Sequence, residues 1–121
     1  MGTGVKLFWD AASEEYADRQ WKHGNIARFD YRQTKKALLR HLVPAKKERI
    51  LEIGCGSGTW TQIIAPRCKE LVAVDLSERM LGEARRSVAR KNVRFLCCDF
   101  MKARLHGKFD KVFSVRAIEY V

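Results

Sequence analysis

One stretch constrains this chain more than any other: the apolar run ILEI, residues 50–53, leads directly into GCGSGTW, residues 54–60. A short apolar run that ends at glycine predicts a strand buried on both faces. Glycine lets the backbone turn sharply and approach a ligand closely, because no Cβ atom stands in the way. The segment therefore predicts a strand, a tight loop and then a helix whose free N–H groups face the loop.

The alternation of strand and helix patterns continues along the chain. Helical patterns lie between the apolar runs, and Ser77 precedes the one at 77–91 as a capping residue. Strands that alternate with helices indicate an α/β fold with a parallel sheet and helices on both faces. The strands expected from the apolar runs are residues 49–54, 70–75, 92–99 and 108–115.

Polar and glycine residues follow each of these strands. In a parallel sheet with right-handed crossovers, the loops that follow the strands meet at one edge. Gly54 to Gly58 follow the first strand, Asp75 and Asp99 end the next two, and residues 114–120 follow the start of the fourth. Their convergence predicts a ligand site at that edge.

The spacing of these residues indicates a nucleoside. Asp75 follows Gly54 by 21 residues, the offset at which a second-strand carboxylate meets the two hydroxyls of a ribose. An acid at this position disfavours a 2′-phosphate. The dinucleotide pattern G-x-G-x-x-G is not met, because Gly58 comes one position early. We therefore expect a nucleoside-containing cofactor other than a dinucleotide.

Four segments resemble the class I S-adenosylmethionine-dependent methyltransferases: LEIGCGSGTWT, VAVDLSERML, VRFLCCDF and FDKVFSVRAIEYV. The resemblance covers residues 50–121, and FWDAASEEYA near the N-terminus is similar to the lead-in of a subgroup that methylates small molecules. It implies a Rossmann-like, doubly wound sheet with strand order 3-2-1-4, incomplete against the family order 3-2-1-4-5-7-6. Residues 1–48 would be a helical lead-in, and residues 49–121 the N-terminal half of a C-terminally truncated cofactor-binding domain.

The resemblance implies S-adenosyl-L-methionine as cofactor and a role for each matched position. Glu52 would lie near its amino group, Asp75 would accept hydrogen bonds from the ribose hydroxyls, and Asp99 would accept one from the adenine amino group. Leu76 and Met80 would press on the adenine ring. Some of these positions have a structural alternative: an ordinary strand-end acid for Glu52, core packing for Leu76 and Met80, and a helix or turn cap for Asp99. The cofactor-binding residues implied are Glu52, Gly54, Gly56, Gly58, Asp75, Leu76 and Met80 (against adenine), Asp99, Phe100 (through its N–H), and Ser114 and Arg116 (at the methionine end).

Methyl transfer is an in-line displacement that depends mainly on positioning and on exclusion of water. Glu119 and Tyr120 are candidates for a base or an orienting group, while Tyr16 and Trp21 are candidates to close over the cofactor. The Asn-Pro-Pro-Tyr signature of amino methylation on nucleic acid bases is absent, and SVRAIEY stands in its place. A small-molecule acceptor is therefore expected; methylation of RNA or protein remains an alternative.

Composition adds a further alternative. The net charge of +10 predicts a basic surface, and nucleic acid is a possible partner, although no aromatic-and-basic recognition motif accompanies the charge. A non-catalytic methyltransferase-like module that binds cofactor or nucleic acid would share these features. The fourth strand would be an exposed apolar edge, which favours self-association.

The remaining features indicate a cytoplasmic protein. We find neither a signal-peptide pattern nor an apolar run long enough to span a membrane. The cysteines show no Cys-x-x-Cys spacing, so we expect reduced, buried thiols and no metal site. They are Cys55, Cys68, Cys97 and Cys98.

Overall fold

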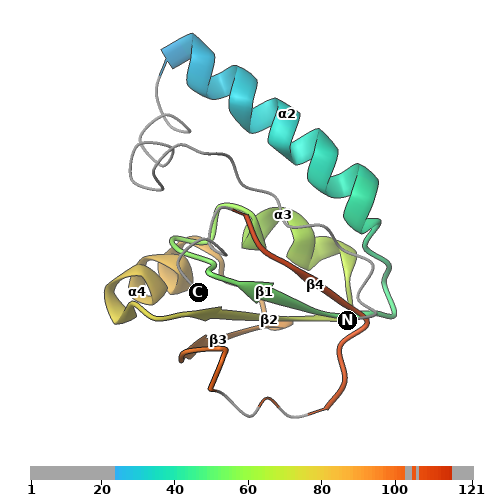
Figure 1. The fold of residues 1–121 in the computed structure, drawn as a ribbon, viewed down its shortest axis with the longest axis vertical. Coiled ribbons are helices and arrows are strands. Elements are labelled where there is room, and N and C mark those ends of the chain that lie inside the picture. The colour runs from blue at the N-terminus through green and yellow to red at the C-terminus, as the bar shows by residue number, and fades with distance from the viewer. Residues whose placement is uncertain (1–23, 103–104, 106, 116–121) are drawn as a thin grey trace.

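The fold is a four-stranded parallel sheet with the strand order β3-β2-β1-β4 (Figure 1). The computed structural model describes residues 24–102, 105 and 107–115. Its strands are β1 (Arg49–Ile53), β2 (Glu70–Asp75), β3 (Val93–Cys97) and β4 (Lys111–Phe113). The predicted α/β class, Rossmann-like sheet and strand order are confirmed, with β3 and β4 shorter than the apolar runs that predicted them.

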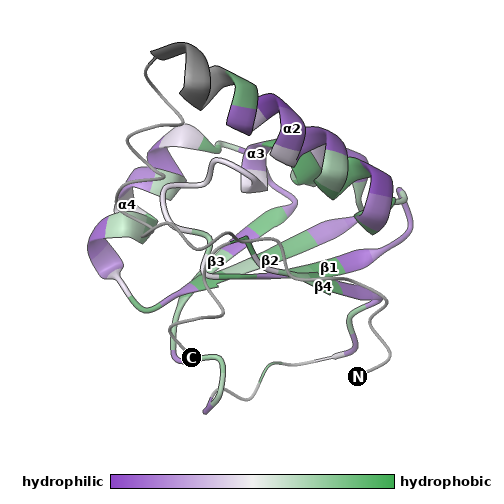
Figure 2. Ribbon diagram, turned by 45° about the horizontal axis from the view of Figure 1, so that its top comes forward, coloured by the Kyte–Doolittle hydropathy of each residue, from purple (hydrophilic) through white to green (hydrophobic). Residues whose placement is uncertain are grey.

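The helices of the described residues all lie on one face of the sheet (Figure 2). They are α2 (Gly24–Leu42), α3 (Thr61–Ile64), which continues as the 3-10 helix η1 (Ala65–Arg67), and α4 (Glu78–Ser87). The opposite face is crossed by the connection from β3 to β4, which contains no helix among its described residues. The predicted second helical layer is thus not seen in the part of the chain that the structure describes, because the described residues of this connection form turns and bends rather than a helix.

The larger core lies between the helices and the sheet. Leu38 and Leu42 of α2 are fully buried there, together with Phe113 of β4. Tyr31 of α2 stacks on Trp60, with the two ring centroids 5.3 Å apart. These contacts hold α2 against the sheet, and the predicted division at residues 48 and 49 falls in the connection between α2 and β1.

A second apolar cluster covers the opposite face of the sheet. Its buried members are Leu51 and Ile53 of β1 with Val72 and Val74 of β2. The β3–β4 connection packs on them through partly buried side chains, among them Phe100. The two central strands are therefore buried on both faces, as their apolar runs predict. β4 pairs with β1, and in the described residues no strand lies along its other side, so self-association there stays a prediction.

Arg49 closes the edge of the sheet where the strands begin. Its Nε donates to Glu70 Oε1 at 2.6 Å and its Nη1 donates to the carbonyl oxygen of Lys108 at 2.9 Å. The guanidinium carbon lies 4.5 Å from the ring centroid of Phe109, and the Arg49 backbone N–H donates to Asp110 Oδ2 at 2.8 Å. Because side chains and loops occupy this edge, the opposite edge, where the strands end, is the one available for a ligand.

Gly58 should be the least replaceable glycine of the loop after β1. Its φ is +92°, and a Cβ atom there would lie 3.0 Å from Val88 Cγ2 and 3.4 Å from Ala84 Cα. We expect Gly58→Ala to lower the free energy of unfolding by about 1–3 kcal/mol, because the change adds both backbone strain and overpacking against the end of α4. Urea unfolding measures it.

Gly82→Ala is the matched control, because Gly82 lies inside α4, where a Cβ atom would come no closer than 3.8 Å to Arg86 Nη1. Alanine there should raise the free energy of unfolding by about 0.5–1 kcal/mol, since it favours the helix. Equal effects of the two substitutions would contradict this account of Gly58.

Candidate functional site

The carboxylate of Asp75 joins the end of β2 to the glycine loop after β1. Its Oδ2 accepts a hydrogen bond from the Gly56 backbone N–H at 2.8 Å, and its Oδ1 accepts one from the Ser77 backbone N–H at 2.9 Å. An ionised carboxylate offers about four acceptor positions, so each oxygen keeps capacity for another donor. The predicted meeting of Asp75 and Gly56 at one edge is confirmed.

The glycine loop itself is fastened to β2. The backbone N–H groups of Gly54 and Cys55 both donate to the Val74 carbonyl oxygen, at 2.8 and 3.1 Å. Gly56 then turns with φ +56°, a conformation that side chains other than glycine rarely adopt. A Cβ atom at Gly56 would lie 3.5 Å from the Met80 methyl carbon, so the first turn of α4 borders the loop. The result is a bare stretch of backbone beside a carboxylate.

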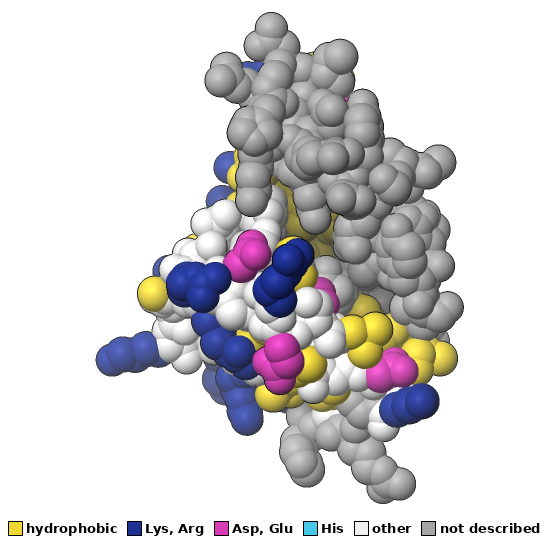
Figure 3. Space-filling view, turned by 90° about the vertical axis from the view of Figure 1, so that its left-hand side faces the viewer, with side chains coloured by type: hydrophobic (Ala, Val, Ile, Leu, Met, Phe, Trp, Pro, Cys, Tyr) yellow, Lys and Arg dark blue, Asp and Glu magenta, His cyan; other side chains and the backbone are white. Residues whose placement is uncertain are grey.

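Large apolar side chains stand exposed at the same edge. Leu76, directly after Asp75, is 68% exposed, and Met101 is 65% exposed. Figure 3 looks at the ends of the strands and shows hydrophobic and acidic side chains side by side there. Exposed apolar surface next to a carboxylate is suited to a ligand that has a flat apolar part and a polar part.

Asp99 lies at the same edge and caps a turn. Asp75 of β2 is the register partner of Cys97 of β3, and the Cys98 backbone N–H donates to the Asp75 carbonyl oxygen at 3.0 Å. Asp99 therefore lies just past the end of the sheet. Its Oδ1 accepts from the Met101 backbone N–H at 3.0 Å. The capping role considered from the sequence is therefore present, and one carboxylate oxygen is engaged in it. A contact of the second oxygen with a ligand stays a prediction.

Glu52 is a buried acid in the middle of the sheet. It pairs with Ala73 of β2 and Phe113 of β4, is 1% exposed, and its Oε1 accepts a hydrogen bond from the Thr61 hydroxyl at 2.5 Å. Burial raises the pKa of Glu52 to about 8; the Thr61 hydrogen bond lowers it and the charge of Asp75 raises it further. Glu52 is thus protonated at neutral pH in this arrangement.

Ser114 is, after Glu52 and Thr61, the third buried polar residue of the described part of the chain. It follows Phe113, is fully buried, and its hydroxyl has no hydrogen-bond partner among the described residues. Buried hydroxyl groups usually have a hydrogen-bond partner, and none of the described residues supplies one for Ser114. Its predicted contact with the methionine end of a cofactor remains a prediction.

Several predicted site residues lie outside the described residues. They are Tyr16, Trp21, Arg116, Glu119 and Tyr120. Sequence reasoning missed two features of the site: Thr61 as the partner of Glu52, and Met101 as an exposed side chain at the edge. The spacing of Thr61 gave no signal, because its contact with Glu52 depends on how α3 packs over β1.

The described residues contain no group of three or more His, Cys, Asp or Glu side chains arranged to hold a metal ion. Within those same residues, no helix combines the length and the apolar character that a membrane span needs. Of the cysteines, Cys55 and Cys68 are buried and Cys97 is exposed, so the expectation of buried thiols is wrong for Cys97, where the edge strand β3 turns its side chain to solvent.

Comparisons with known proteins agree with this geometry. The sequence model of the methyltransferase domain family matches residues 50–121. An uncharacterized methyltransferase of Mycobacterium bovis is 34% identical over 86 residues, which are 70% of this chain and 44% of that protein. The trans-aconitate 2-methyltransferase of Pseudomonas aeruginosa is 42% identical over 69 residues, 51% of this chain and 25% of that protein.

A solved structure gives the same result for the fold. The N-methyltransferase NodS from Bradyrhizobium japonicum, in complex with S-adenosyl-L-homocysteine, superposes with a TM-score of 0.62 at 26% identity. The match covers 81% of this chain and 53% of NodS. The chain thus spans less than half the length of the Mycobacterium bovis and Pseudomonas aeruginosa proteins.

The raised pKa of Glu52 gives a pH test. The folded protein keeps this proton up to about pH 8, whereas the unfolded chain loses it near pH 4.5, so between these values the unfolded state binds fewer protons. The Glu52 contribution should therefore lower the free energy of unfolding as the pH rises through this window, by on the order of a few kcal/mol in all, with no further change above it.

Glu52→Gln is the control, because glutamine can still accept the Thr61 hydrogen bond but does not ionise. Subtracting its urea-unfolding curves from those of the wild type at each pH isolates the contribution of Glu52. We expect the difference in the free energy of unfolding between the two proteins to change with pH between about pH 4.5 and pH 8, and to be constant above pH 8. A difference that is the same at every pH would show that Glu52 is not buried as described.

Proposed function

The chain belongs to the methyltransferase domain family, with S-adenosyl-L-methionine as cofactor, and from that premise we propose that it is the cofactor-binding part of an enzyme that methylates a small molecule. The observation that carries the proposal is the pair of hydrogen bonds that fix the Asp75 carboxylate between the Gly56 and Ser77 backbone N–H groups. This carboxylate is held in place before any ligand arrives, which reduces the cost of binding.

The ribose would lie against Asp75 and Gly56. Two adjacent hydroxyls can donate to the two oxygens of one carboxylate, each of which has one acceptor position in use. Gly56 lets the sugar approach the backbone, since its Cα carries no side chain. The residues present therefore fit a nucleoside without a 2′-phosphate.

The adenine would lie beside Leu76, which is exposed and directly follows Asp75. Met80 borders the glycine loop, and Met101 is exposed just past the end of β3, so both are further apolar candidates for contact with the ring. The second oxygen of Asp99 and the backbone N–H of Phe100 would meet the polar edge of the ring. Apolar contact on the ring face combined with hydrogen bonds at its rim is the usual chemistry of a purine site.

The methionine end would lie toward Glu52 and Ser114, with Arg116 as a candidate for its carboxylate. A cationic amino group near Glu52 would favour the ionised carboxylate, so binding would release the proton that burial retains. The unpaired Ser114 hydroxyl would gain a partner directly or through water.

Transfer of the methyl group would depend on this placement. S-adenosyl-L-methionine supplies the reactive methyl when bound; the chain's own residues orient the cofactor and exclude water from it. Glu119 and Tyr120 remain the candidates to orient or deprotonate the acceptor. A small-molecule acceptor is supported by the similarity to a protein named for trans-aconitate and by the absence of the Asn-Pro-Pro-Tyr signature.

Asp75→Ala tests the proposed ribose contact. We expect the affinity for S-adenosyl-L-homocysteine, measured by isothermal titration calorimetry, to fall by about 1–3 kcal/mol, since the change removes the acceptor of both hydroxyls and frees the loop. Wild-type protein should bind S-adenosyl-L-methionine in the same range and should not bind NAD.

Asp110→Ala is the matched control. Asp110 also accepts a backbone N–H bond, from Arg49 at 2.8 Å, but it lies at the opposite edge of the sheet. The affinity should stay within about twofold of wild type in this variant, because surface changes away from the site have small effects. If both aspartate variants lose affinity equally, or if neither does, the assignment of Asp75 to the ribose is wrong.

A further inference from the structure

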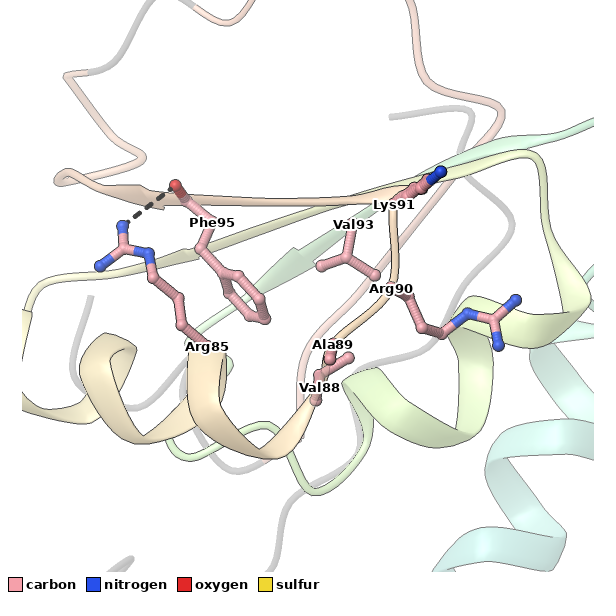
Figure 4. Close-up of a pocket in the computed structure, with 7 residues that line it drawn as sticks. All are labelled: Arg85, Val88, Ala89, Arg90, Lys91, Val93 and Phe95. Atoms are coloured by element: carbon pink, nitrogen blue, oxygen red, sulfur yellow. Dashed lines mark hydrogen bonds between the residues drawn. The ribbon is translucent and has the colours of Figure 1, made fainter.

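An apolar groove lies between the C-terminal end of α4 and β3. Val88 and Ala89, at the end of α4, form one side, and Val93 and Phe95 of β3 form the other (Figure 4). Its volume is about 410 Å³. The groove is open along one side, because β3 is an edge strand of the sheet in the described residues. Apolar side chains of this kind are usually covered by a neighbouring helix or strand, and here they line an open space.

Cations stand at both ends of the groove. Arg85 lies at one end, and Arg90 and Lys91 lie at the other (Figure 4). All three side chains are exposed, and residues 85–94 include five Lys or Arg side chains and no acid. Arg85 Nη2 lies 3.5 Å from the Phe95 carbonyl oxygen and Arg85 Nη1 lies 4.0 Å from Glu78 Oε1 in an exposed ion pair, while Arg90 Nε donates to Asn92 Oδ1 at 3.1 Å. Each guanidinium has five N–H donors, so both keep donors for an anion, which at Arg85 would compete with Glu78.

Phe95 directly follows this basic segment in the sequence, and the fold places it across the groove from the end of α4. We propose that this groove binds single-stranded nucleic acid, with phosphates at Arg85, Arg90 and Lys91 and one base inserted beside Phe95. Guanidinium groups match phosphate oxygens in geometry, and a base offers a flat face to an aromatic ring and apolar side chains. The net charge of +10 adds a long-range attraction for a polyanion.

Single-stranded nucleic acid fits better than the other anionic polymers. A duplex keeps its bases stacked, so none is free to enter the groove. An acidic polypeptide would satisfy the cations but has no flat ring in its charged side chains to fill the space beside Phe95. Arg90 and Lys91 at one end of the groove and Arg85 at the other match a single strand, because it carries a phosphate on each side of an inserted base.

The groove is separate from the proposed cofactor site. Ser77, which donates to Asp75, caps the first turn of α4, while Val88 and Ala89 lie just past its last residue. Ser77 and Val88 lie at the two ends of α4, about 15 Å apart along its ten residues, and Val88 also borders Gly58 of the glycine loop. This inference therefore goes beyond the proposed function, and the two can fail independently, because cofactor binding and nucleic acid binding are measured separately.

Fluorescence anisotropy with a labelled 12-nucleotide oligouridylate and the full chain tests the proposal, over a series of salt concentrations. The double variant Arg90→Glu/Lys91→Glu should weaken binding by at least about tenfold and flatten the dependence of affinity on salt, because two phosphate contacts are lost. The matched control is Arg32→Glu/Lys36→Glu, which makes the same change of charge at exposed positions of α2. It should weaken binding by no more than about threefold, through the general field alone.

Phe95→Leu separates base insertion from charge. Leucine keeps the site apolar, so the fold should be retained, as thermal unfolding will show, while binding weakens by about fivefold or more with an unchanged salt dependence. Equal losses in the two charge-reversal variants would overturn the proposal. The proposal would also be overturned if poly-glutamate, or a duplex of equal length, bound as tightly as the single strand. The first result would assign the groove to acidic protein, and the second would assign it to charge alone.

Discussion

The hydrogen bond from the Gly56 backbone N–H to Asp75 Oδ2 is the contact on which the site depends. It joins the loop after β1 to the end of β2, and it needs both a glycine conformation and a carboxylate at the end of β2. Without Asp75 the Gly56 N–H would lose this acceptor, and without the loop Asp75 would be an ordinary acid at the end of a strand. Together they form a rigid acceptor beside bare backbone, which is what recognition of a ribose requires.

The rest of the sheet supports this contact. The two central strands are buried on both faces, so the end of β1 and the end of β2 cannot shift against each other without loss of core packing. Arg49 and its partners close the edge where the strands begin, and the glycine loop and Asp75 occupy the edge where they end. Glu52 is an ionisable side chain buried in this otherwise largely apolar core. Burial disfavours its charged form, and this raises its pKa.

Much of the fold and part of the site can be predicted from the sequence. Apolar runs that end at glycine or aspartate gave β1 and β2, and the parallel order then placed Gly56 next to Asp75. Contacts between elements could not be predicted, because they depend on how side chains pack across the fold. The Thr61 hydrogen bond to Glu52, the single helical face and the position of Phe95 across the groove from the end of α4 are of this kind.

The most direct test of the ribose site is the response of individual backbone amides to S-adenosyl-L-homocysteine, followed by ¹H–¹⁵N NMR. The account predicts that the Gly56 and Ser77 amides, both bonded to Asp75, shift together and saturate with the ligand, while the Arg49 amide at the opposite edge does not move. Saturable binding that leaves Gly56 and Ser77 unperturbed would contradict it.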